Sequence, residues 1–319
     1  MTATKDVPGR SAGKLTAAAR FREIRVTPAE TTIPMLESFL AFVEAMPAWQ
    51  KVAWVIVVLG FSWVLEAVLP LVPLRYRKLR HAGVNGAFLA TNLLINAAFA
   101  VATVAVAAWT AERGFGLLHL FELPLWAEML VALAALDLMA QYIAHYLLHR
   151  VRWMWRLHVV HHSDTKVDAT TGVRLHPGDF AVRETFALTA VVATGAPLAF
   201  YLLYRVITIL FTLVTHANFS PPERLDAALS WVVVTPHMHK FHHHFERPWT
   251  DTNFGGILSI WDRMFGTFVY GDPRRVVYGV DVADPERDED VVHQFGLPFT
   301  DARRLDRDAG VDSFSGPGG

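Results

Sequence analysis

The run of residues from Ala82 to Ala111 contains no charged side chain. A soluble helix of that length would present a charged or polar face to water, so the run predicts a helix that spans a membrane. Composition agrees: 53% of the 319 residues are hydrophobic and only 18% are charged, against roughly 25% charged residues in ordinary soluble domains. We therefore expect an all-α integral membrane protein.

Three further apolar regions accompany this run. Residues 52–73 and 123–148 each have the length of one membrane-spanning helix. Residues 185–215 are too long for one simple crossing, because a single helix of that length would measure about 46 Å against about 30 Å of hydrocarbon. Pro197 would interrupt such a helix, so we expect a tight helical hairpin or a re-entrant pair there. About four transmembrane helices result.

Both ends of the chain are polar. Residues 1–35 are basic-leaning and predict a flexible segment, and residues 281–319 become Gly/Ser-rich and predict a partly disordered tail. The membrane domain is then expected within residues 36–280. A basic turn at residues 75–80 is expected on the cytosolic side by the positive-inside rule, and two spans later this places residues 149–184 on the same side.

Charge and cysteine content exclude several classes of function. The net charge is -1, so no overall field points to nucleic acid as a partner. The chain has no cysteine, which excludes disulfides, iron–sulfur clusters, haem–thiolate chemistry and thiol nucleophiles. Any metal must therefore be bound by nitrogen and oxygen ligands.

Histidines are concentrated in two short parts of the chain. Eleven of the 15 lie within residues 145–176 and 237–244, and eight of these form one HxxxH and two HxxHH sets. On a helix these spacings place the side chains on one face, where imidazoles can share a metal such as iron, zinc, copper or nickel. The eight are His145, His149, His158, His161, His162, His239, His242 and His243. Buried together without metal they would be costly, so the sequence predicts a site for metal ions.

These sets resemble the histidine boxes of the fatty acid hydroxylase and sterol desaturase superfamily of membrane di-iron oxygenases. The resemblance extends from about Glu66 to Thr267 and includes the strings MWRLHVVHHSD, VRLHP, THANF and TDTNFGGILSIWDRMFGTF. Tyr146 departs from the usual pattern, in which arginine follows the first histidine. The resemblance implies about four membrane helices beneath a cytosolic helical cap, with the eight histidines as ligands of two iron ions. It also implies hydroxylation or desaturation of a lipid C–H bond by dioxygen.

Further ligands are usual in such sites, and His216 and His176 are the candidates. Side chains that could orient a ligand imidazole or a bound water are Asp137, Asn218, Asp251 and Asp262. The lipid is expected to enter from the bilayer. Electrons must come from an external donor such as a ferredoxin, or a cytochrome with its reductase, since the sequence has no nucleotide-binding GxGxxG motif after a strand.

Other classes of protein also use histidines near membranes. A zinc-dependent lipid hydrolase is an alternative, because catalytic zinc needs only three protein ligands. A haem protein needs only two axial histidines for each haem. A metal transporter would hold its ligands near the bilayer midplane on broken helices, whereas these sets lie at or beyond the expected helix ends.

Overall fold

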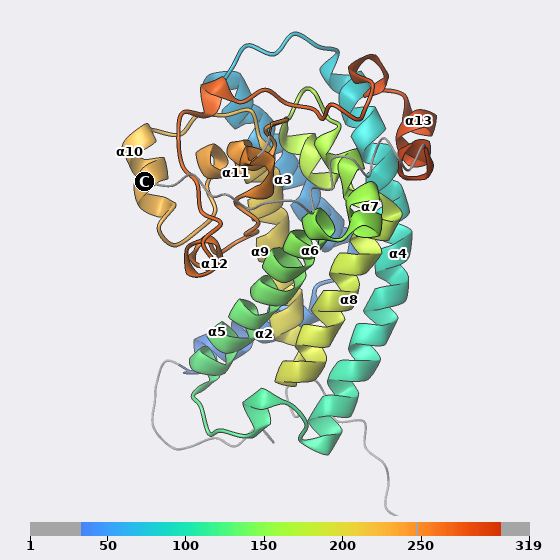
Figure 1. The fold of residues 1–319 in the computed structure, drawn as a ribbon. Helices are drawn as coiled ribbons and strands as arrows, with labels where there is room; N and C mark the ends of the chain where they lie inside the picture. Colours follow the sequence, from blue (N-terminus) through green and yellow to red (C-terminus); the bar gives the residue numbers. More distant parts are fainter. Residues whose placement is uncertain (1–32, 247, 301–319) are drawn as a thin grey trace, which may run out of the picture.

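The computed structural model describes residues 33–246 and 248–300, and within these residues the regular secondary structure is helical (Figure 1). The longer helices are α2 (Ile33–Ala45), α3 (Ala48–Val68), α4 (Lys78–Arg113), α5 (Leu125–Leu136), α7 (Arg152–His162), α8 (Pro177–Thr194) and α9 (Leu198–His216). The short α-helices are α6 (Ala144–Arg150), α10 (Glu223–Leu229), α11 (Pro236–His242), α12 (Ile260–Met264) and α13 (Val291–Gly296). A π-helical segment, η2 (Asp137–Ile143), joins α5 to α6.

Short 3-10 segments complete the described part. They are η1 (Leu117–His119), η3 (Ala169–Val173), η4 (Trp249–Asp251), η5 (Pro273–Arg275), η6 (Pro285–Arg287) and η7 (Leu297–Phe299). Long helices form a bundle, and the short elements that follow residue 151 gather over one end of it (Figure 1). We call residues 152–176 and 217–300 the cap. Residues 1–32 and 301–319, and with them most of the expected N-terminal segment and the end of the expected tail, lie outside the described residues.

Four helical stretches are long and apolar enough to cross a membrane: Ala48–Val68, Lys78–His119, Leu125–Arg150 and Leu198–His216. Their outward side chains are apolar and exposed, as Leu94 and Val101 on α4 illustrate at 76% and 73% exposure. Such surfaces suit hydrocarbon rather than water. The prediction of an all-α membrane fold with about four candidate spans is confirmed.

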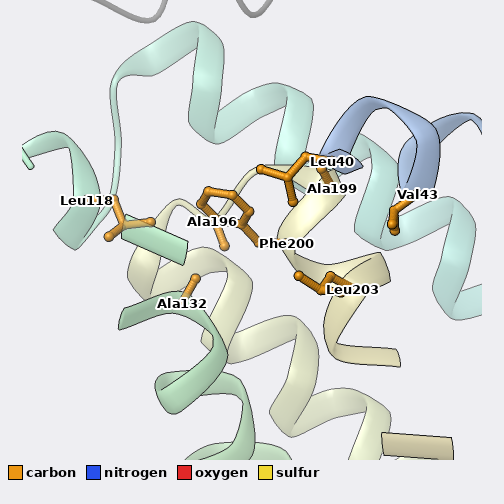
Figure 2. Close-up of a cluster of buried hydrophobic side chains, with 8 residues drawn as sticks. All are labelled: Leu40, Val43, Leu118, Ala132, Ala196, Ala199, Phe200 and Leu203. Carbon is orange, nitrogen blue, oxygen red and sulfur yellow. The ribbon is translucent and has the colours of Figure 1, made fainter. Parts of the chain in front are cut away.

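The apolar region at residues 185–215 is divided into two helices. Gly195 ends α8 in the left-handed conformation (φ 70°), and Pro197 precedes α9, so the chain reverses between them. This tip is buried against α2, η1 and α5 (Figure 2), in a cluster of Leu40, Val43, Leu118, Ala132, Ala196, Ala199, Phe200 and Leu203. The break expected at Pro197 is present, and α9 returns the chain toward the cap.

Polar contacts attach the cap to the bundle. Glu66, near the end of α3, pairs with Lys78 and accepts hydrogen bonds from the backbone N–H groups of Ala169 and Asn218. His81 lies inside α4 and is fully buried beside Asp164. Its environment is polar because the chain after α7 folds back onto α4.

The first part of the expected tail packs against α7 and α4. Val282, Ala283 and Leu297 are buried against Trp155 of α7 and Phe88 of α4. The charged composition of this segment gave no sign of this packing, since its few apolar side chains are widely spaced along the chain. It covers the outer side of the helix that carries the first HxxHH set.

Candidate metal centre

Nine buried histidine side chains converge where the bundle meets the cap. They lie on α6, α7, the end of α9, and α11 with the residue that follows it; Figure 1 shows how these helices are arranged. Their nitrogens form two groups, and within each group the ligand atoms lie within 4.8 Å of one another. The five-histidine group comprises His145, His149, His158, His162 and His242, and the four-histidine group comprises His161, His216, His239 and His243. The structure thus brings together all eight histidines of the three spaced sets and adds His216.

Each HxxHH set contributes to both groups. On α7 the outer histidines, His158 and His162, belong to the five-histidine group, whereas His161 belongs to the four-histidine group. In the second set the outer histidines, His239 and His243, belong to the four-histidine group and the middle one belongs to the other. Residues four apart lie one above the other on a helix, so they reach the same group. The intervening residue is rotated toward the neighbouring group.

The Nδ1 atoms of four rings in the five-histidine group contact protein acceptors. They donate to the Phe254 carbonyl (His145, 3.0 Å), Asp251 Oδ1 (His149, 3.2 Å), Asp179 Oδ2 (His158, 2.6 Å) and the Thr252 carbonyl (His242, 2.8 Å). His216 Nδ1 in the four-histidine group donates to the Thr212 carbonyl at 2.7 Å. Because carbonyl and carboxylate oxygens only accept, Nδ1 carries the proton and Nε2 presents a lone pair.

Several of these Nε2 atoms approach one another closely. The Nε2 atoms of His145 and His158 are 3.0 Å apart, and Nε2 of His216 lies 3.1 Å from Nε2 of His161 and 3.0 Å from Nε2 of His239. For His145 and His158, both Nδ1 atoms donate elsewhere, so two lone pairs face each other at 3.0 Å and repel unless a cation accepts both. Among the described residues, Nε2 of His242 also has no hydrogen-bond partner, although it is fully buried. The donor set therefore fits metal ions.

The cap histidines are in the protonation state that metal binding requires. Burial, reinforced by neighbouring imidazoles, lowers the pKa well below its ordinary value for His158, His161, His162, His239, His242 and His243. Because protonation would place a charge in this buried site, the rings stay neutral at pH 7. A neutral imidazole is the form that coordinates iron or zinc.

The two additional ligand candidates have different positions. His216 ends α9 and lies within the four-histidine group. His176 lies outside both groups: its Nδ1 accepts a hydrogen bond from the Gly178 N–H at 3.1 Å, and its ring lies beside Phe295 and Phe299. The turn before Pro177 gives this ring a helix-capping role, so the structure does not bring it to the metal centre.

Of the candidate carboxylates, Asp251 lies beside a ligand histidine, whereas Asp137 and Asp262 bind backbone groups. Asp251 contacts a ligand imidazole, that of His149. Asp137 accepts hydrogen bonds from the N–H groups of Ile257 and Leu258 and from Trp261, so it anchors the loop that follows Phe254 rather than a ligand ring.

Asp262 and Asn218 also bind backbone. Asp262 accepts from the N–H groups of Phe254 and Gly255, at 2.7 and 2.9 Å, and so fixes the segment whose carbonyl holds His145. Asn218 makes two hydrogen bonds to the backbone of Val72. Their short polar side chains stabilise connections between segments, as Asp and Asn commonly do in turns.

Asp179 is a site residue that the sequence interpretation missed. It is fully buried, contacts His158 Nδ1, and accepts a second hydrogen bond from Arg183 Nε at 2.9 Å. The signal was weak, because Asp179 lies in the first turn of α8 and no motif links it to His158. The contact arises from the packing of α7 on α8.

Gly172 in η3 lies against α9 beside His216. An added Cβ would lie 2.7 Å from Thr212 Cγ2 and 2.8 Å from the Thr212 carbonyl, the acceptor for His216 Nδ1. We expect Gly172→Ala to destabilise the protein by about 1–3 kcal/mol and to lower metal content. Thermal unfolding and metal analysis would check both. Gly60→Ala is the control, because no atom of the described residues lies within 4 Å of a Cβ there. Unchanged stability and metal content in Gly172→Ala would contradict the expectation.

A cavity of about 360 Å³ extends between α2, α3, α4, α8 and α9. It reaches both histidine groups, since His145 and His216 form part of its lining. Much of the remaining lining is apolar, with side chains such as Leu89 on α4 and Ile209 on α9. A lipid chain lying between these helices could therefore approach the metal centre.

Comparison with known proteins finds a protein family whose model matches part of this chain. Residues 129–267 match the model of the fatty acid hydroxylase family, a range that contains all nine histidines of the two groups and Asp179. No solved structure matches the chain.

Curated relatives match a similar share of the chain. An ornithine lipid hydroxylase from Rhizobium tropici is 32% identical over 133 residues, which is 42% of this chain and 39% of the relative. Alkylglycerol monooxygenases from Xenopus tropicalis and Homo sapiens are 30% and 29% identical, over 44% of this chain and 30% of each relative. The chain thus spans well under half the length of these relatives.

Proposed function

Because this chain belongs to the fatty acid hydroxylase superfamily, we propose that it is a membrane-bound di-iron oxygenase that hydroxylates a C–H bond of a lipid. In the balanced reaction one oxygen atom of dioxygen enters the C–H bond and the other leaves as water. Two electrons and two protons are consumed. The electrons come from a separate protein, a ferredoxin or a cytochrome with its reductase.

The observation that carries the proposal is the pair of buried imidazole groups. One metal would bind to the five-histidine group and the other to the four-histidine group. A catalytic zinc ion is complete with three protein ligands, whereas nine converge here, so the donor set favours a redox metal pair over a hydrolytic zinc. Iron supplies the activation of dioxygen when bound.

The chain's own residues hold and orient the site. Carbonyl and carboxylate acceptors fix the ring orientation of His145, His158 and His242, so that their Nε2 atoms face the interior of the group. Burial of these rings excludes bulk water. The cavity leads from the membrane helices to both histidine groups, where His145 and His216 line it, and provides the route for an apolar substrate.

We propose that the chain is a multi-pass membrane protein and that its metal centre lies on the cytosolic side. Support comes from the basic residues at 75–80, which lie at the cap end of the bundle, where Lys78 pairs with Glu66 and Arg80 with Glu289. Basic residues next to spans favour the cytosolic side. The cap and the two histidine groups share this end.

Lipid extracts from cells with and without the gene, compared by mass spectrometry, test the proposal. We expect a lipid that gains one oxygen atom only in cells with the gene, and only when oxygen is present. A loss of two hydrogen atoms instead would indicate desaturation. Oxygen-independent release of a head group or acyl chain would contradict the proposal and support a hydrolase.

A further inference from the structure

Polar side chains form part of the lining of the cavity between the helices. Asn92 and Asn96 lie one turn apart on the same face of α4, and Glu184 of α8 and Arg205 of α9 face the same cavity. We call these four residues the polar strip. They stand among the apolar residues of helices that are suited to hydrocarbon, where charged side chains are expensive and usually functional.

The strip is connected across three helices. Arg205 pairs with Glu184 and donates from Nη2 to Asn96 Oδ1 at 3.2 Å, while the Tyr201 hydroxyl donates to Glu184 Oε2 at 3.1 Å. A buried ion pair contributes little net stability compared with well-packed apolar side chains. A cavity for plain hydrocarbon would therefore be served better by apolar residues at these positions.

Asn92 provides the second, independent observation. It is 4% exposed, and its Nδ2 donates to the Leu175 carbonyl at 3.0 Å. Among the described residues, its Oδ1 has no hydrogen-bond partner. A buried oxygen without a donor costs roughly 1–3 kcal/mol, so this atom requires a donor from a molecule in the cavity.

The chemistry of the strip selects the ligand. A hydroxyl group can donate to Asn92 Oδ1, and its own oxygen can still accept from an N–H donor of the strip. An anionic group would meet the Glu184 carboxylate and the Asn92 oxygen, and a pure hydrocarbon would leave Asn92 unsatisfied. We propose that the polar strip binds a hydroxyl group of a neutral lipid, a statement that rests on the proposed function and names its substrate class.

Binding without turnover tests the assignment. The metal-loaded full chain in nanodiscs is titrated with tritium-labelled 1-hexadecanol, hexadecane and hexadecanoate, and saturable binding is measured. One to two hydrogen bonds correspond to about a tenfold advantage of the alcohol over the alkane. We expect Asn92→Leu, and separately the double variant Glu184→Leu/Arg205→Met, to reduce alcohol binding about tenfold and to leave alkane binding unchanged.

Thr110→Val is the matched control, because Thr110 is a buried polar residue of α4 outside the cavity lining. It should bind all three probes as the unsubstituted chain does, in the same discs and with the same partition of probe into lipid. If the double variant does not fold, Asn92→Leu decides. Alcohol preference retained in Asn92→Leu, or hexadecanoate binding more tightly than hexadecanol, would overturn the assignment. Binding that follows the expectation without any oxygenated lipid in cells would instead contradict only the proposed function.

Discussion

Replacing His242 with alanine is expected to reduce bound metal from about two ions per chain to about one and to reduce lipid hydroxylation at least about 100-fold. The change removes a nitrogen from the five-histidine group and leaves the Thr252 carbonyl without its donor. Loss of residues that only orient a ligand already costs 10–100-fold, so loss of a ligand should cost more. Metal analysis of the purified protein and product quantification measure the two effects. His161→Ala should give the same result through the four-histidine group.

His244→Ala is the matched control for His242→Ala. His244 lies two residues away, is partly exposed, and belongs to neither group; its Nδ1 accepts from the Glu246 N–H. We expect normal metal content and normal hydroxylation in this variant. Full metal content together with normal turnover in His242→Ala would remove His242 from the metal centre, whatever the control shows.

Helical spacing made the histidine sets predictable, but their division into two groups depends on tertiary packing. The spacing of His158, His161 and His162 places them on one side of a helix, and it does not say which metal each one faces. That choice depends on where α9 and α11 meet α7, since His216 and His239 join His161 there. His216 was a candidate because it ends the returning arm of the expected hairpin.

The roles of Asp137 and His176 were harder to predict from the sequence, because a polar side chain can contact a metal ligand, bind backbone groups or cap a helix. Asp137 lies two turns before His145 on the same helical stretch, so a contact with a ligand was a reasonable expectation. The π-helical segment η2 intervenes, however, and Asp137 binds the backbone of the loop at residues 257–258 instead. Similarly, His176 has a metal-binding side chain, but the turn before Pro177 makes it the N-cap of α8.

A second large effect is expected for Asp179→Asn, which should weaken metal binding about 10–100-fold. The nine imidazoles are neutral, so nearby carboxylates provide the negative charge that balances the metals. The Asp179 carboxylate places negative charge beside His158, from whose Nδ1 it accepts a hydrogen bond at 2.6 Å. An asparagine oxygen can still accept that bond, so the ring stays oriented while the charge is lost, and Arg183 loses its ion-pair partner.

Competition with a chelator measures the affinity, and Asp226→Asn is the control. Asp226 is equally buried and lies 3.8 Å from His237, which belongs to neither group; it accepts from Thr235 and Tyr270 within the cap. Its replacement should lower the free energy of unfolding and leave metal affinity unchanged. Because His158 belongs to the five-histidine group, Asp179→Asn should release one ion before the other. Equal weakening of both ions would instead mean that Asp179 supports the packing of α7 on α8 rather than one metal.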